Sequence, residues 1–184
     1  MNQLLTESFL TYFGGDDKGI RVFTAPGRVN LIGEHTDYNG GFVFPAALTM
    51  STTVLARPRN DRQINLIATD LKKMVSANLD ELDRYKTLKW GNYQLGVADE
   101  LQKAGYRIIG CDLLYDDKVP LGSGLSSSAA IEIATAIALV SLGDACYNLS
   151  HAAFLLKALE QDDPTLLRLA CRDRLHQDAR FALI

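Results

Sequence analysis

The sequence has few cysteines and no excess of positive charge. Its three cysteines, Cys111, Cys146 and Cys171, lie far apart and form no Cys-x-x-Cys pair. Such an odd, sparse set argues against a disulfide framework or a zinc site and favours reduced thiols in the cytoplasm. The formal net charge is -3 at pH 7, so the composition gives no reason to expect binding to nucleic acid or to an anionic membrane.

Long uncharged apolar runs are also missing, as is a basic-then-apolar signal segment near the N-terminus. The most apolar stretch, residues 131–142, is shorter than the roughly 20 residues of a membrane span and predicts a buried core helix. With 47% hydrophobic residues in a length of 184, the chain can build one sizeable core. We therefore expect a cytoplasmic globular protein that does not bind membranes.

Hydrophobic periodicity along the chain predicts a mixed α+β fold with strands dominating the first third. Helical spacing occurs at residues 4–13 and 93–104, and each stretch is followed by glycine. Pro26 is expected to end the first strand. The predicted strands are residues 20–24, 42–44, 51–57, 63–68, 74–79 and 109–115.

The most chemically varied segment is residues 25–38, which begins with Pro-Gly and is followed by Asn-Gly-Gly. It contains an arginine, two carboxylates, a histidine, an asparagine and a tyrosine. Each of these groups would cost about 1–3 kcal/mol if it were buried without a partner, so together they have no use in a hydrophobic core. On a tight turn they can converge on a small polyhydroxylated molecule, with carboxylates accepting from hydroxyls and the arginine donating to an anion.

A second motif, Pro-Leu-Gly-Ser-Gly-Leu-Ser-Ser-Ser-Ala-Ala, occupies residues 120–130 and precedes the apolar run. Its two glycines permit backbone conformations that side chains would forbid. A Gly/Ser loop that opens a helix presents unpaired N–H groups at the positive end of the helix dipole, and is therefore suited to bind an anion. It is not a Walker A loop, because no Gly-Lys-Ser/Thr follows. The alternative is a flexible linker with a serine N-cap.

Both motifs resemble those of one superfamily. Gly-Arg-x-Asn-Leu-Ile-Gly-Glu-His-x-Asp-Tyr at residues 27–38 is similar to the galactokinase signature. Residues 120–130, called the serine loop below, resemble the phosphate-binding loop of the GHMP kinases. The segments 42–47, 56–59 and 90–93 also resemble galactokinase. This resemblance implies the GHMP kinase N-terminal domain, which is related to the second domain of ribosomal protein S5, with a mixed sheet and helices on one face.

The resemblance implies transfer of the γ-phosphoryl group of ATP to the anomeric hydroxyl of galactose, with Mg²⁺ as a cofactor. Arg28 would stabilise charge on the transferring phosphoryl group, while Glu34, His35 and Asp37 would bind sugar hydroxyls. Ser128 would also face the Mg²⁺ ion. The loop residues that would hold the triphosphate are Gly122, Ser123, Gly124, Leu125, Ser126, Ser127 and Ser128.

These residues also have ordinary structural explanations. Arg28 can form a surface ion pair, and the carboxylates of Glu34 and Asp37 can cap turns. His35 can satisfy nearby backbone groups. A buried carboxylate at Glu132 needs a partner, and we interpret it as structural rather than metal-binding. Trp90 is either a core residue or a pocket wall.

Residues 1–143 are thus expected to form a galactokinase-like domain that binds ATP and sugar, and residues 144–184 a helical tail. Ser150 and Asp163-Pro164 are predicted to begin two further helices. The tail lacks the Gly-Ile-Met-Asp-Gln segment that carries the catalytic aspartate in galactokinases, and resembles a more C-terminal piece of a GHMP kinase of the homoserine kinase type. We interpret it as a truncated, internally deleted or chimeric remnant.

This departure leaves three interpretations open. The chain is a galactokinase whose activity is lost or severely reduced, a non-catalytic protein that binds galactose and ATP, or an inactive fragment. The sequence also leaves open the choice between galactose and N-acetylgalactosamine, and the oligomeric state.

Overall fold

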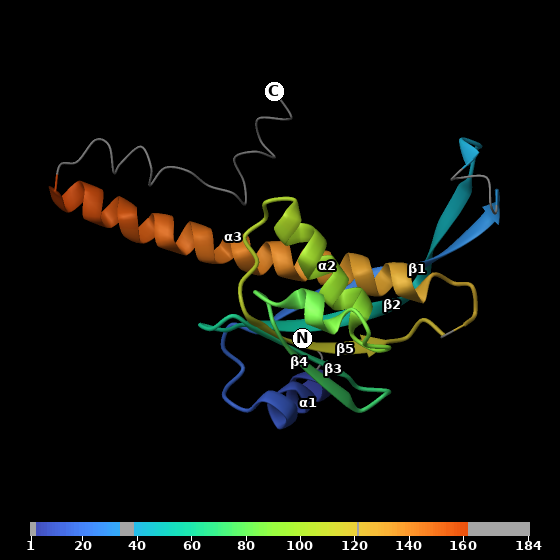
Figure 1. Cartoon of the computed structure of the whole chain (residues 1–184), viewed down its shortest axis with the longest axis horizontal. Coiled ribbons are helices and arrows are strands. Elements are labelled where there is room, and N and C mark those ends of the chain that lie inside the picture. The colour runs from blue at the N-terminus through green and yellow to red at the C-terminus, as the bar shows by residue number, and fades with distance from the viewer. Residues whose placement is uncertain (1–2, 34–38, 121, 162–184) are drawn as a thin grey trace.

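The computed structural model describes residues 3–33, 39–120 and 122–161, with the backbone alone for 145–161 (Figure 1). The order of elements mixes helices and strands, as the periodicity predicted. The elements are α1 (Gln3–Phe13), β1 (Arg21–Ile32), β2 (Phe44–Pro58), β3 (Gln63–Ala68), β4 (Lys73–Asn78), the short 3₁₀ helix η2 (Leu82–Tyr85), α2 (Asn92–Lys103), β5 (Cys111–Asp117) and α3 (Ser127–Gln161).

The strands form one five-stranded sheet with the order β1-β2-β5-β3-β4. Strands β1 and β2, β2 and β5, and β3 and β4 pair antiparallel, whereas β3 and β5 pair parallel. The predicted mixed α+β sheet is therefore confirmed. Strand β5 lies at its centre, so the loop that leaves β5 for α3 begins in the middle of the sheet.

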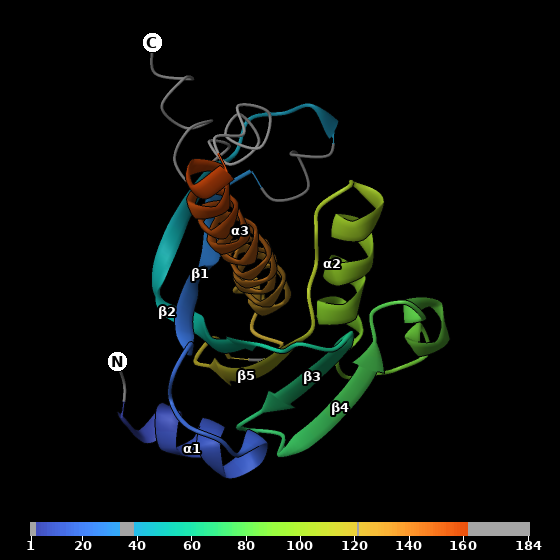
Figure 2. The same cartoon turned by 90° about the vertical axis from the view of Figure 1, so that its left-hand side faces the viewer.

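Helices α2 and α3 cover one face of the sheet, and α1 lies on the other face (Figure 2). Adjacent residues of β5 show the division, because successive side chains of a strand point to opposite faces. Leu113 belongs to the main core with Ala134 and Leu139 of α3, whereas Leu114 packs with Phe9 of α1. Helices α2 and α3 lie on one face of the sheet, as predicted. Helix α1 lies on the other face, which the prediction did not include.

Strands β1 and β2 are longer than predicted. Pro26 does not end β1, because β1 is an edge strand in which a missing N–H is tolerated, and the register shifts between Pro26 and Arg28. β5 pairs only with the last part of β2, from Thr52 onward, so the distal parts of β1 and β2 extend beyond the sheet as a two-stranded arm (Figure 1). The segment expected to be a turn from residue 25 is therefore β-strand as far as Ile32.

Helix α3 is also longer than predicted, since it continues through Gly143 and Ser150 to Gln161. The expectation that the helix stops near residue 142 and that Ser150 caps a new one is wrong. Gly143 is a point of close packing rather than a helix end, because a Cβ there would overlap the carbonyl oxygen of Arg107. The predicted start at Asp163-Pro164 lies outside the described residues.

One window of α3, Ser127–Asp144, is long and apolar enough to cross a membrane, with a mean hydropathy of 1.3. The same test is passed by core helices of soluble proteins. Here Ala134, Ala138 and Leu142 are almost fully buried in the main core, and the window carries two carboxylates. The packing is that of the core helix predicted from the apolar run.

Candidate functional site

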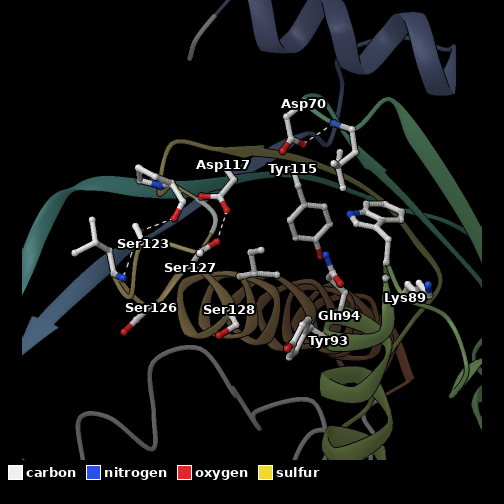
Figure 3. Close-up of a pocket in the computed structure, with 18 of the residues that line it drawn as sticks. Asp70, Lys89, Tyr93, Gln94, Tyr115, Asp117, Ser123, Ser126, Ser127 and Ser128 are labelled. Carbon is white, nitrogen blue, oxygen red and sulfur yellow. Dashed lines mark hydrogen bonds between the residues drawn. The ribbon is translucent and has the colours of Figure 1, made fainter. Parts of the chain in front are cut away.

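A pocket of about 500 Å³ opens where β5 ends and α3 begins, and the first turn of α2 closes one side of it (Figure 3). One part of its wall is the serine loop, and the rest combines aromatic and apolar side chains with the polar side chains of Asp70, Lys89 and Gln94. The residues that line it are Ala68, Asp70, Leu71, Lys89, Trp90, Gly91, Tyr93, Gln94, Tyr115, Asp117, Pro120, Gly122, Ser123, Gly124, Leu125, Ser126, Ser127, Ser128 and Ile131.

The serine loop has the left-handed backbone that its glycines predicted. Gly122 and Gly124 have φ angles of 71° and 73°. Ser126 has a φ of 61°, which is uncommon for a residue with a side chain and places strain at the start of α3. The carbonyl of Ser126 accepts the N–H of Ala130 at 3.0 Å, so α3 begins directly after it.

The loop leaves backbone donors available. Within the described part of the chain, the N–H groups of Ser126, Ser127 and Ser128 have no protein acceptor. They lie at the N-terminus of α3, where the aligned peptide dipoles concentrate positive partial charge. The pocket wall at this point is therefore suited to bind an anion, as the sequence predicted.

Asp117, the last residue of β5, holds this loop in place. Its Oδ2 accepts the Ser127 hydroxyl at 2.6 Å, and its Oδ1 accepts the Thr52 hydroxyl at 3.0 Å and the Val119 N–H at 2.9 Å. One carboxylate thus joins β2, β5 and the first turn of α3. Its sequence position gave no signal of this role, because a charged residue at a strand end normally indicates solvent exposure.

The arginine-containing strand meets the serine loop directly. The Arg28 N–H donates to the carbonyl of Leu125 at 3.1 Å. Gly27 is buried at the same place, where a Cβ would lie 2.9 Å from the Leu125 carbonyl oxygen and 3.1 Å from a methyl carbon of Val119. The two motifs, far apart in the sequence, therefore lie side by side.

The predicted site residues differ in where the structure places them. All seven loop residues from Gly122 to Ser128 line the pocket. The Arg28 backbone touches the loop, but its side chain is exposed and does not line the pocket. Glu34, His35 and Asp37 lie outside the described residues.

Two of the predicted serine hydroxyls have different surroundings. The Ser127 hydroxyl is occupied by Asp117, and Ser127 is nearly buried. Ser128 is exposed, lines the pocket and has no hydrogen-bond partner for its hydroxyl within the described residues. Ser128 is therefore the more available of the two as an oxygen ligand.

The wall opposite the loop contains residues that sequence reasoning did not assign to the site. Tyr93 lines the pocket (Figure 3). Trp90 also lines it and packs against the main core, so it is both a wall residue and a core residue. Gln94 is 3% exposed. Glu132 does not line this pocket but a separate groove between α2 and α3.

Tyr115 forms the floor of the pocket as a neutral group. Burial raises the pKa of its phenol well above the usual range. Its hydroxyl lies 2.9 Å from the Thr135 hydroxyl, which donates to the Ile131 carbonyl at 2.7 Å. Because Thr135 has only one proton to donate, Tyr115 is the donor of this pair.

Comparison with known proteins agrees with this geometry. The family model "Galactokinase galactose-binding signature" matches residues 7–58, and "GHMP kinases N terminal domain" matches residues 92–167. A galactokinase of Clostridium tetani is 46% identical over 133 residues, which are 72% of this chain and 33% of the relative. A galactokinase of Lactococcus lactis is 44% identical over 160 residues, 85% of this chain and 39% of the relative.

A solved structure, Lactococcus lactis galactokinase complexed with galactose, superimposes with a TM-score of 0.68 at 41% identity. The superposition covers 79% of this chain and 41% of that protein. The chain thus spans between about a third and two-fifths of the relatives that it matches. The two family matches, in the order of the two motifs, and the shared fold lead to one conclusion: the chain carries a galactokinase galactose-binding signature followed by a GHMP kinase N-terminal domain.

Proposed function

We propose that this chain forms the galactose- and ATP-binding region of a galactokinase, which transfers the γ-phosphoryl group of ATP to the anomeric hydroxyl of galactose and yields galactose 1-phosphate. The observation that supports this most directly is the hydrogen bond between Arg28 and Leu125. It joins β1, which carries the first part of the galactokinase-like signature and is called the sugar-signature strand below, to the serine loop. Phosphoryl transfer depends mainly on positioning and charge stabilisation, and this arrangement can supply both.

The pocket fits a nucleoside triphosphate. The unpaired N–H groups at the start of α3 suit phosphate oxygens, and the aromatic wall at Trp90 and Tyr93 suits a flat base. Its volume of about 500 Å³ is within the range of small-molecule sites. We therefore assign the loop to the triphosphate and the opposite wall to the base.

A Mg²⁺ ion also fits the site, with Ser128 as its protein ligand. Mg²⁺ is usually held by one or two protein oxygens together with phosphate oxygens and water, so a cluster of carboxylates is not required. The described residues contain no group of three or more His, Cys, Asp or Glu side chains that could hold a metal. When bound, the ion would neutralise charge on the phosphates.

Arg28 is the proposed residue that stabilises charge on the transferring phosphoryl group. Its backbone is fixed beside Leu125, and its guanidinium has no ion pair within the described residues, so it is free to engage an anion. Glu34, His35 and Asp37 are the proposed partners of the sugar hydroxyls. The cytoplasm is the proposed location.

The test uses the full chain with ATP, Mg²⁺ and galactose, and follows ADP release together with calorimetric binding. We expect turnover that Arg28→Ala abolishes, because the substitution removes the guanidinium but retains the backbone hydrogen bond to Leu125. Arg84→Ala is the matched control, since Arg84 is exposed in η2 and, in the described structure, its side chain pairs with Glu81. Glucose replaces galactose in a second control.

Three results distinguish the interpretations. Turnover in wild type and Arg84→Ala but not in Arg28→Ala supports the kinase. Binding of both ligands without ADP release favours a non-catalytic protein that binds galactose and ATP. If neither ligand binds, the proposed function is wrong for this chain.

A further inference from the structure

Gln94 places an unsatisfied amide in the wall of the nucleotide pocket. The residue is 3% exposed, and its Oε1 is buried with no hydrogen-bond partner in the described structure. Gln94 lies in the first turn of α2, and in Figure 3 its side chain extends toward the ring of Tyr115. A buried polar group without a partner destabilises the folded protein, so its presence here calls for an explanation.

Packing does not explain Gln94. The other buried positions of α2 are Leu95 and Ala98, and Leu95 packs in the main core. An apolar side chain of similar size, such as leucine, would fill the same space without leaving an amide unpaired. The unpaired amide therefore lowers the stability of the folded protein. A ligand with matching donor and acceptor groups can remove this cost by pairing with the amide.

The aromatic residues of the base-facing wall cannot choose between nucleobases, and the polar side chains of Asp70 and Lys89, which also line the pocket, are exposed to solvent. Trp90 and Tyr93 offer aromatic faces, and stacking on such faces tolerates every base because every base has a π-face. The strongest discrimination comes from a buried polar group that the wrong base leaves unpaired. Gln94 is the buried side chain of this wall with an unpaired polar atom in the described structure.

The hydrogen-bonding groups of the Gln94 amide match one particular edge of a nucleobase. A glutamine carries an acceptor and donors on one planar group, and rotation about its last bond can present either. Adenine offers an amine donor beside a ring-nitrogen acceptor, which matches the amide in both positions. These two groups, N6 and N7, form the Hoogsteen edge of adenine, and we place the base with this edge toward Gln94. On the same edge guanine offers two acceptors, O6 and N7, so the amide oxygen would stay unpaired.

We propose that Gln94 is the residue that selects adenine, its amide accepting from the exocyclic amine and donating to the neighbouring ring nitrogen. This inference rests on the proposed function, because it takes the pocket to be the nucleotide site. Gln94 acts in specificity and not in the transfer step.

The test measures binding of ATP and GTP, each with Mg²⁺, to the full chain. Trp90 is the only tryptophan in the sequence and lines the pocket, so its fluorescence reports occupancy directly. We expect wild type to prefer ATP by about tenfold or more. In Gln94→Leu we expect ATP affinity to fall about tenfold and the ATP-to-GTP ratio to fall to within about threefold, because the pocket then relies on stacking.

Thermal unfolding separates a ligand role from a structural one. Gln94→Leu should unfold at a higher temperature than wild type without nucleotide, because the substitution removes an unpaired buried amide. Gln102→Leu is the matched control, since Gln102 lies in the same helix but does not line the pocket. It should leave both nucleotide affinities unchanged.

The outcomes are distinct. An unchanged ATP-to-GTP ratio in Gln94→Leu, with ATP still bound, overturns the role of Gln94 but leaves the proposed function standing. A lower unfolding temperature with an unchanged ratio shows that Gln94 serves the fold. If wild type binds neither nucleotide, the proposed function and this inference both fail.

Discussion

The backbone N–H of Arg28 donates to the carbonyl of Leu125 at 3.1 Å, and this contact joins the edge strand β1 to the serine loop. The approach is close because Gly27 has no side chain. A Cβ at Gly27 would lie 2.9 Å from the Leu125 carbonyl oxygen, shorter than ordinary contacts, and 3.1 Å from Val119. The position of the sugar-signature strand relative to the loop therefore depends on one glycine.

Gly27→Ala should separate this strand from the loop. Neither the carbonyl of Leu125 nor the backbone that carries it can move without changing the loop. We expect a loss of about 1–3 kcal/mol in the free energy of unfolding, as for other overpacked sites, and weaker ATP binding. Urea denaturation and calorimetry measure the two effects.

Gly96→Ala is the control, and we expect it to raise the free energy of unfolding instead of lowering it. Gly96 lies within α2 and a Cβ there meets nothing within 4 Å, so alanine should stabilise the helix by about 0.5–1 kcal/mol. ATP binding should not change. Equal stability effects of the two substitutions would contradict the packing argument.

Asp117→Ala should weaken both the fold and the nucleotide site. It removes the acceptor for Ser127, for the Val119 N–H and for Thr52, which is 0% exposed. Loss of one partner from buried hydrogen bonds predicts about 2–3 kcal/mol of destabilisation. ATP affinity should fall at the same time because the first turn of α3 loses its anchor.

Asp116→Ala provides the comparison for Asp117. Asp116 accepts from Thr69 and pairs with Lys118, and it does not line the pocket. It should reduce stability without changing ATP affinity, as calorimetry will measure. An equal loss of ATP affinity in both variants would argue against a specific role for Asp117.

The sequence predicted correctly those structural features that depend only on residues close together in the chain. Helix α1, strand β3 and the left-handed glycines of the loop agree with the expectations, because spacing and backbone freedom are local properties. The loop lines the pocket, and its role in binding a phosphate stays a prediction. The roles of Arg28, Ser128 and the three sugar-binding candidates stay predictions.

The structure differs from the sequence predictions where contacts between residues far apart in the sequence determine the local structure. Pro26 continues a strand because β1 lies at the sheet edge, and Gly143 continues a helix because it packs against Arg107. Asp117 joins the site only because Thr52 and Ser127 come together in space. None of these contacts has a periodic signal in the sequence.

Acid should remove a stabilising contribution from Asp61. A hydrogen bond from Arg59 lowers the pKa of Asp61 from 3.8 to about 2, and the Gln63 N–H acts in the same direction. Since the folded pKa lies below the unfolded one, this contribution is complete above about pH 4 and is lost as the pH falls toward 2.

The pH effect is measured from melting temperatures of wild type and Asp61→Asn between pH 6 and 2. Wild type should be more stable at pH 6, and the difference should shrink toward pH 2 because protonated Asp61 resembles asparagine. Asp17→Asn is the control, since Asp17 is exposed and has no ion pair in the described structure. A difference that stays constant with pH would rule out titration of Asp61 as its cause.

Arg57 should carry the attachment of α1 to the sheet. Its guanidinium donates to the Gly14 and Asp16 carbonyls at 2.9 and 3.0 Å, lies 5.0 Å from the centre of the Phe9 ring and pairs with buried Asp112 at 3.1 Å. Arg57→Met keeps the apolar stem but removes these contacts.

We expect Arg57→Met to cost about 2–4 kcal/mol in the free energy of unfolding, because the carbonyls that follow α1 lose a charged donor and, among the described residues, the Asp112 carboxylate is left with Arg59 and Asn65 as partners. Arg84→Met, which breaks an exposed ion pair, should change stability by less than about 1 kcal/mol. Amide hydrogen exchange should accelerate in α1 before it does in β5, because α1 is the element that Arg57 holds from outside the main core. Equal acceleration in both elements would mean that Arg57 supports the sheet as a whole rather than the docking of α1.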